Sequence, residues 1–353
     1  MPLARSEYIQ RVLIALGLVA LAVILFEALQ LAAGVLLFLF AGILLAVLLD
    51  GLARLLSDSS PLPRRVALAI VLFALAGAVF ATGWYLGPQV GNQVQRLAAQ
   101  LPEAVSQAEA WLQERGWGAV VAEHVPESVG GALPEGTSGL GALQTAFSSV
   151  FGLLANGVIV LAVGIFLAIN PSLYVDALVH LVPPSRRPRT RTVFAALGSA
   201  LRHWLLGRIA SMLVVGLLTG IGLMIFGIPL ALALGLIAAL FSFVPYIGPI
   251  LALVPALAVA AGEGTQAVIT VLAIYGAVQV VESYLVTPLI QQRAVSMPPA
   301  LLIAAQVLMG ALAGFVGVAV ATPLVVVLVV LVQMLYVEDV LGDDVEVMGG
   351  GAD

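Results

Sequence analysis

The sequence predicts an all-α membrane protein that crosses the bilayer with about eight helices. Of its 353 residues, 62% are hydrophobic and only 9% are charged, whereas about a quarter of the residues of a soluble domain are charged. The apolar residues form long continuous runs, and a helix needs about 20 of them to cross the hydrocarbon core. Strands of a membrane barrel would instead alternate apolar and polar residues. The pattern therefore favours helices over a barrel.

The apolar runs place the helices along the chain. Residues 12–49 are long enough for two spans, with a turn at Glu27 and Gln30. The start resembles a signal peptide but has no evident small-residue cleavage site, so we expect a retained helix. Further apolar runs cover 66–86, 146–169, 205–226, 228–261, 268–287 and 300–335, and we expect Pro323 to bend the last one.

These runs divide the chain into six parts. Between the third and fourth spans, apolar residues recur at helical spacing from Val90 to Trp111, which predicts an amphipathic segment outside the membrane. We expect transmembrane helices 1–3 in 1–88, the external amphipathic segment in 89–145, helix 4 in 146–170, a cytoplasmic loop in 171–204, helices 5–8 with the broken helix in 205–336, and an acidic tail in 337–353.

Arginine positions predict the orientation. All 14 basic residues are arginines, and eleven of them precede the first span or lie in the regions 50–65 and 171–208. Cytoplasmic loops carry an excess of basic residues, so we expect a multi-pass inner-membrane protein with a cytoplasmic N-terminus. The side of the C-terminus depends on residues 228–261. A single crossing there would give eight spans and a cytoplasmic tail, whereas a re-entrant hairpin would put the tail outside.

The most informative stretch is Phe-Val-Pro-Tyr-Ile-Gly-Pro at 243–249, in the middle of an apolar run. Each proline removes an N–H and disturbs the preceding turn, so the helix should break here. Carbonyls freed within a membrane must be satisfied by protein or line a cavity, and transporters often build binding sites this way. The alternative is a kink kept for packing. We place Pro245, Tyr246, Gly248 and Pro249 in a candidate site for substrate or ion.

A polar stripe follows on the next span. Tyr275, Gln279, Glu282 and Ser283 recur at three- and four-residue spacing, which puts them on one face of a helix. A charge at the bilayer centre costs at least about 2.5 kcal/mol, so Glu282 is a candidate to bind a cation or carry a proton. The alternative is a structural carboxylate that is paired with Arg293 or hydrogen-bonded across helices. Gln306 and Thr322 are isolated polar residues, typical of packing hydrogen bonds.

Several classes of chemistry find no support. The chain has no lysine, which excludes a Walker A loop, and no cysteine. Its three histidines lie far apart outside the spans, so we expect no metal site. No catalytic motif is present. We therefore expect no enzyme, no cofactor and no nucleic-acid partner, and we expect the lipid bilayer as the main environment.

The C-terminal half resembles the autoinducer-2 exporter family, also called PerM-type permeases. Three motifs carry this resemblance over about residues 205–335: Gly227-Ile228-Pro229 followed by the 243–249 stretch; Gln279-x-x-Glu282 followed by Pro288-Leu289-Ile290 and Pro298; and Gly310, Gly314 and Gly317 leading into Ala321-Thr322-Pro323-Leu324. The resemblance implies about eight spans, cytoplasmic termini and a homo-oligomer, a pentamer among the options. One departure is Arg208, where the family pattern suggests glutamine.

The resemblance also implies a function. Family members are linked to export of the small polar signal autoinducer-2, and others to sodium/proton exchange. We predict a secondary-active permease that exports such a solute, coupled to a proton or sodium gradient. Gly310, Gly314, Gly317 and Pro323 would let the last helix bend or slide. The alternatives are a sodium/proton antiporter and, from another class, a non-transporting oligomeric scaffold.

Overall fold

The computed structural model describes residues 34–77, 80–81, 84, 157–286, 288 and 298–343. Every element within these ranges is a helix, and four of the helices are long and apolar enough to cross a membrane, or five if one bent pair counts as a span. The prediction of a helical membrane protein is confirmed, while the count of about eight spans stays a prediction. The first span, the external segment 89–145, Arg293 and the acidic tail beyond residue 343 lie outside the described residues.

The N-terminal helices pack through glycines. The helix Gly34–Asp58 crosses the helix Gly157–Ile169 so closely that a Cβ at Gly42 would lie 2.6 Å from Val163 Cγ1. Such small residues let membrane helices approach each other. The first of these helices continues nine residues beyond the expected end at residue 49, because its last turns form an amphipathic helix that includes an Asp50–Arg54 pair at i,i+4 spacing. A third helix covers residues 64–77.

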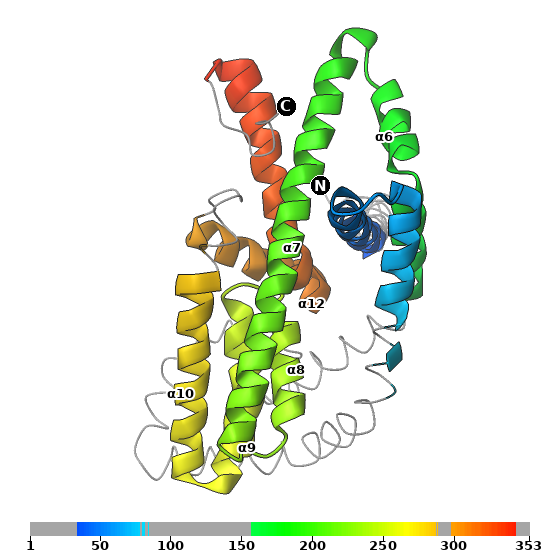
Figure 1. Cartoon of the computed structure of the whole chain (residues 1–353). Helices are drawn as coiled ribbons and strands as arrows, with labels where there is room; N and C mark the ends of the chain where they lie inside the picture. Colours follow the sequence, from blue (N-terminus) through cyan, green and yellow to red (C-terminus); the bar gives the residue numbers. More distant parts are fainter. Residues whose placement is uncertain are drawn as a thin grey trace, which may run out of the picture.

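The segment 171–204, expected as a loop, is helical. The chain bends by 84° after Ile169 and continues as α6 (Pro171–His180), followed by the short 3-10 helix η1 (Pro184–Arg186). Pro171 and Pro184 each begin a helix, where a missing N–H costs little. Next, α7 (Arg187–Ile225) has 39 residues and is therefore about 58 Å long. The expected fifth span at 205–226 is its second half, and Figure 1 shows α7 running through most of the molecule.

Residues 228–261 form a helical hairpin with its break at 242–246. α8 (Ala231–Phe241) has only 11 residues, and α9 (Ile247–Glu263) and α10 (Thr265–Val281) have 17 each. α8 runs antiparallel to α7, because Gly216 faces Ala239 while Gly220 faces Ala231. The structure therefore supports the hairpin and not the single crossing, and α7, α8, α9 and α10 lie side by side in the lower half of Figure 1.

A second reversal lies within α12 (Pro299–Val332). Ala313 and Gly314 leave helical geometry, and Gly314 has φ 59° and ψ −145°, a conformation open almost only to glycine. Gln306 Nε2 then donates to Thr322 Oγ1 at 3.2 Å, although in a straight helix these residues would be about 24 Å apart along the axis. The sharp turn is at Gly314. Pro323, where we expected a bend, lies inside the second arm.

This second reversal brings the end of the chain back to the start of α7. Beyond α12, the π-helix η3 (Gln333–Leu341) returns to the beginning of α7, where Arg189 Nη2 lies 2.9 Å from both Glu338 and Asp339 and 2.7 Å from the Met334 carbonyl oxygen. Our argument that a hairpin at 228–261 would put the tail on the opposite side from the arginine-rich segment did not include the turn at Gly314, so the side of the tail stays a prediction. Figure 1 shows the red end of the chain beside the upper part of α7.

Three apolar cores hold these elements together. One joins the second half of α7 to α8, α9 and α10. Another joins the first half of α7, the second arm of α12 and the helix Gly34–Asp58. The third joins the helices of the N-terminal half. Large apolar side chains remain exposed on the outer surfaces, such as Leu213 and Leu217 at about 60%, as expected of helices that face lipid.

Candidate transport site

Glu282 lies buried at the end of α10, where the helix widens into the π-helix η2 (Glu282–Val286). Its side chain is only 6% exposed. Oε1 accepts hydrogen bonds from Ser211 Oγ at 2.7 Å and from Arg208 Nη1 at 3.2 Å, and Oε2 accepts one from Gln279 Nε2 at 3.3 Å. A single π-turn within a helix often marks a functional site. The carboxylate is thus held by donors from α7 and from its own helix.

Arg208 links this carboxylate to the broken helix. Its side chain is 12% exposed, and its Nε donates to the carbonyl oxygen of Phe243 at 3.1 Å. Phe243 belongs to the break between α8 and α9, where the prolines leave carbonyls without helical partners. A guanidinium therefore satisfies both a freed carbonyl and a buried carboxylate. The other terminal nitrogen, Nη2, is buried and has no partner among the described residues.

The break itself has a defined shape. Tyr246 adopts φ 64° and ψ −59°, a strained conformation for a residue other than glycine. The Ile247 N–H donates to the Pro245 carbonyl at 2.8 Å, which closes a tight turn before α9. A Cβ at Gly248 would lie 1.9 Å from the Phe241 carbonyl oxygen, so only glycine fits there. Pro249 lies in the first turn of α9, where helices tolerate proline.

The structure brings part of the predicted set together. Gln279 and Glu282 are in contact, and Gln279 Nε2 also lies 3.4 Å from Ser283 Oγ. Tyr275, on the same stripe, donates instead to the Ala252 carbonyl of α9 at 3.3 Å. The four residues of the break shape its backbone, and the described side-chain partners of Glu282 come from α7 and α10.

Sequence reasoning missed Arg208 and Ser211. We had counted Arg208 among the arginines that mark the cytoplasmic side, although it follows the start of the expected fifth span. Two signals pointed to it: a charged residue inside an apolar run needs a partner, and Ser211 lies three residues later on the same helix face. Of the two structural alternatives for Glu282, hydrogen bonding across helices is the one observed, while Arg293 lies outside the described residues.

The small glycines of the C-terminal half lie where the chain folds back on itself. Gly310 faces Val318 across the turn of α12, and a Cβ at Gly317 would lie 2.0 Å from the Met309 carbonyl oxygen. Gly314 makes the turn itself. These residues, which we had assigned to bending or sliding, close the α12 hairpin. At its tip, Phe315 packs edge-on against Phe241 with ring centroids 5.9 Å apart, so the tips of both hairpins meet.

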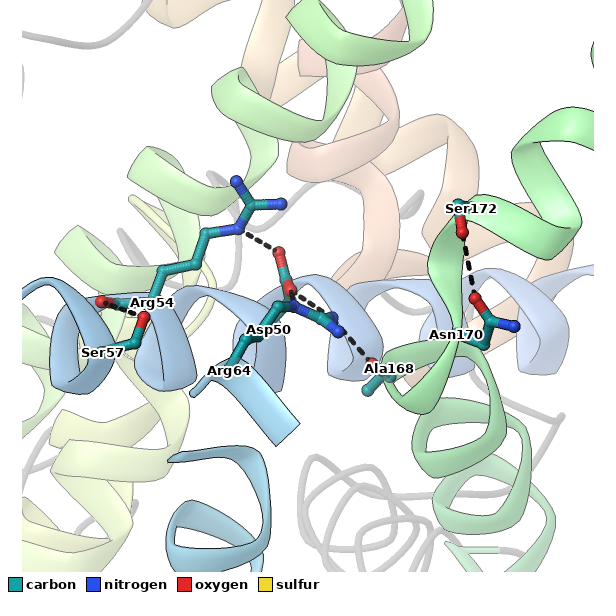
Figure 2. Close-up of polar contacts among 7 residues, drawn as sticks. All are labelled: Asp50, Arg54, Ser57, Arg64, Ala168, Asn170 and Ser172. Carbon is teal, nitrogen blue, oxygen red and sulfur yellow. Dashed lines mark hydrogen bonds and ion pairs between the residues drawn. The ribbon is translucent and has the colours of Figure 1, made fainter. Parts of the chain in front are cut away.

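A second ionic cluster joins the N-terminal helices and lies apart from Glu282 in the sequence. Figure 2 shows Arg54 and Arg64 reaching the carboxylate of Asp50, with Nε to oxygen distances of 2.7 and 2.8 Å. Arg64 also donates to the Ala168 carbonyl at 2.9 Å, near the end of its helix. Both carboxylate oxygens of Asp50 are occupied, so this cluster fixes three helices to each other. Within the described ranges, no group of three acidic, histidine or cysteine residues could hold a metal ion.

The motifs of the C-terminal half agree with comparison to known proteins. Residues 13–336 match the family described as "AI-2E family transporter". The chain belongs to the AI-2E family of transporters. This confirms the resemblance drawn from the C-terminal motifs and extends it over nearly the whole chain.

Similar proteins come from several bacteria. The chain is 24% identical to YueF, a candidate transport protein of Bacillus subtilis, over 81% of this chain and 79% of that one. It is 30% identical to a candidate transport protein of Mycobacterium tuberculosis, over 76% of this chain and 74% of that one. With the Bacillus subtilis candidate transport protein YrrI it shares 33% identity, but the match covers 43% of each chain. A general role in membrane transport follows from the family.

Proposed function

We propose that this protein is a secondary-active permease that exports a small polar solute, autoinducer-2-like by family resemblance, and is coupled to a proton or sodium gradient. The observation that carries the proposal is the buried carboxylate of Glu282, which is bound by Arg208 and Ser211 directly beside the break between two short helices. An ionisable residue within a membrane costs free energy, and those that proteins retain usually mark the path of a substrate or an ion.

The ion pair suggests how coupling would work. A proton or a cation that binds Glu282 competes with Arg208 for the same oxygen, Oε1. Neutralising the carboxylate would leave the charge of the guanidinium uncompensated. Its Nη2 already has no hydrogen-bond partner among the described residues. Arg208 would then bind an oxygen atom of the solute. Because Arg208 also donates to the Phe243 carbonyl, its movement would pull on the break at the hairpin tip.

The site is net neutral and rich in hydrogen-bonding groups. Arg208 and Glu282 cancel in charge, while Ser211 and Gln279 contribute a hydroxyl and an amide. Such a site suits a small solute with hydroxyl or carbonyl groups and no net charge. Tyr246, Pro245, Gly248 and Pro249 would contribute through the shape of the hairpin tip. Inner-membrane location, a cytoplasmic N-terminus and a homo-oligomer complete the proposal, on the arginine distribution and the family resemblance.

An antiporter is the second candidate, and the same ion pair favours it. Exchange of a proton for sodium at Glu282 needs no solute at all. The two functions differ in what crosses the membrane, so one experiment separates them.

The test is flux in proteoliposomes that contain the purified protein, with autoinducer-2 inside and an imposed proton or sodium gradient. We expect gradient-dependent release, lost in Glu282→Gln and kept in the matched control Glu263→Gln, which removes an exposed carboxylate at the end of α9. Gradient-driven sodium or proton exchange without release of the solute would identify the antiporter. If neither solute release nor ion exchange exceeded that of protein-free vesicles, both transport functions would be overturned and the scaffold would remain.

A further inference from the structure

The ionic cluster around Asp50 carries more positive than negative charge. One carboxylate accepts hydrogen bonds from both Arg54 and Arg64. Figure 2 shows Nε of Arg54 at this carboxylate and its two terminal nitrogens directed away from it. Those two nitrogens have no partner among the described residues, and the Arg54 side chain is 51% exposed. The cluster therefore keeps N–H donors that a further anion could bind.

A third arginine reaches the same turn of the helix Gly34–Asp58 from α7. The aliphatic stem of Arg202 packs against Gly51, so closely that a Cβ there would lie 2.9 Å from Cγ and 3.1 Å from Cδ of the arginine. The guanidinium group begins at the atom bonded to Cδ, so it lies beside the turn that contains Asp50 and Arg54. Arg202 forms no hydrogen bond or ion pair within the described part of the chain. Three guanidinium groups thus share one carboxylate.

Neighbouring charges do not remove this excess. Asp58 lies about two turns after Asp50 and is exposed, and no ion pair joins it to the cluster among the described residues. Arg65 is exposed as well and adds another positive charge. The arginines near the start of α7 differ, because Arg189 and Arg191 are paired with carboxylates. The cluster around Asp50 therefore keeps a positive charge that its own residues do not neutralise.

The position of the cluster along α7 matches the level of lipid headgroups. Residues 205–225 of α7 are long enough to cross the hydrocarbon core, so Arg202 comes within one turn of the edge of the core. The helix 64–77 begins at the cluster, and its apolar side chains Val66, Ile70 and Phe73 are exposed. A ligand here would meet guanidinium groups at one end and exposed apolar side chains beside them.

These features select the class of ligand. Guanidinium groups bind phosphate oxygens through paired N–H groups, and basic pockets between membrane helices on the cytoplasmic side bind anionic lipid headgroups. A soluble anion would use the guanidinium groups alone, whereas the acyl chains of a phospholipid would also cover the apolar side chains of helix 64–77. We propose that Arg54, Arg64 and Arg202 bind the phosphate of an anionic phospholipid where the N-terminal helices meet α7.

Such a lipid would connect the N-terminal helices to the helix that carries the transport site. Arg54 and Arg64 belong to two different N-terminal helices, whereas Arg202 precedes Arg208 by six residues on α7. The phosphate would bridge all three helices and reduce the repulsion between their arginines. This binding does not depend on the proposed transport function, and binding is what the experiment measures.

The test is the thermal unfolding of the purified full-length protein in a zwitterionic detergent, titrated with phosphatidylglycerol or with phosphatidylcholine that has the same acyl chains. A ligand that binds only the folded state raises the unfolding midpoint in a concentration-dependent way. We expect phosphatidylglycerol to act at lower concentration than phosphatidylcholine. An arginine near an anionic headgroup contributes about fivefold in affinity, so Arg54→Gln and Arg202→Gln should each need about fivefold more phosphatidylglycerol for the same rise.

Two further variants control for charge and for folding. Arg191→Gln removes one positive charge from the same helix as Arg202 but outside the cluster, so it should need as much phosphatidylglycerol as the wild type. Arg202→Lys keeps the charge and the aliphatic stem, so its response should lie closer to that of the wild type even if Arg202→Gln does not fold.

Three results would overturn the proposal. One is an equal response to the two lipids. Another is an equal requirement for phosphatidylglycerol in Arg54→Gln, Arg202→Gln and Arg191→Gln. The third is a rise of the same size with inorganic phosphate, compared with chloride at equal ionic strength, because it would identify a free anion as the ligand. None of these measurements involves solute flux through the Glu282 site, so their failure is distinct from failure of the transport function.

Discussion

Arg208 and Glu282 form an ion pair between α7 and the end of α10, with 3.2 Å between Nη1 and Oε1 and side chains only 12% and 6% exposed. The two residues are 74 positions apart. The pair also attaches the hairpin of α8 and α9 to α7, because Arg208 donates to the Phe243 carbonyl. Stability, the geometry of the break and the proposed coupling therefore depend on the same two side chains.

The first prediction concerns the energetics of this pair. Breaking a buried pair by removing one partner typically costs about 3–5 kcal/mol, because the remaining charge is left unpaired. We expect Arg208→Gln and Glu282→Gln each to lower the unfolding midpoint in detergent, and the double variant to lower it less than the sum of the two.

A double-variant cycle supplies the control. Arg191 forms an exposed pair with Asp176 at 2.7 Å, and exposed pairs contribute about 0–1 kcal/mol. The cycle on that pair should show little coupling. Additive losses for Arg208 and Glu282 would mean that the pair does not act as one unit.

The second prediction concerns the break between α8 and α9. A Cβ at Gly248 would lie 1.9 Å from the Phe241 carbonyl oxygen, so Gly248→Ala must push the two helices of the hairpin apart. We expect a large loss of stability, of the order of 3 kcal/mol or more. Gly262→Ala is the matched control. Gly262 lies on the same helix, and a Cβ there would meet no atom within 4 Å. Equal midpoints for both variants would show that the hairpin tip is looser than described.

The sequence predicts the parts of this site that depend on neighbouring residues, and not the contacts between helices that are distant in the chain. Gln279 and Glu282 were predictable, because their stripe repeats at helical spacing within one apolar run. The break at Pro245–Pro249 was predictable as well, because proline acts on its own turn. Arg208 was not paired with Glu282 in advance, since nothing in either local pattern records that α7 and α10 lie side by side.

The reversal at Gly314 was harder to foresee for a different reason. The run 300–335 is uniformly apolar, so a single long span and a hairpin have the same hydropathy. Glycines recur in membrane helices as packing residues, and nothing local separates that use from a turn. Pro323 was the stronger breaker by composition, yet it lies within the second arm. Contacts between the two arms, such as that between Gln306 and Thr322, reveal the fold.

The third prediction follows from the backbone at this turn. Gly314 has φ 59° and ψ −145°, while a Cβ there would meet no atom within 4 Å. Gly314→Ala should therefore destabilise through backbone strain alone, by about 1–3 kcal/mol. Gly276→Ala, in α10 with equally open space around its Cβ, should be neutral or stabilising. A neutral Gly314→Ala, measured by the unfolding midpoint, would contradict the tight reversal.

The last prediction concerns topology. Because the chain reverses at both hairpins, Asp343 should lie on the same side of the membrane as Ser185, which lies just before α7, whereas Gln266 at the start of α10 should lie on the opposite side. The protein has no cysteine, so single Ser185→Cys, Gln266→Cys and Asp343→Cys variants give unambiguous labels. A membrane-impermeant thiol reagent applied to sealed vesicles of one orientation should label Ser185→Cys and Asp343→Cys alike and Gln266→Cys oppositely. Labelling of Asp343→Cys together with Gln266→Cys would mean that α12 crosses the membrane once, without its turn at Gly314.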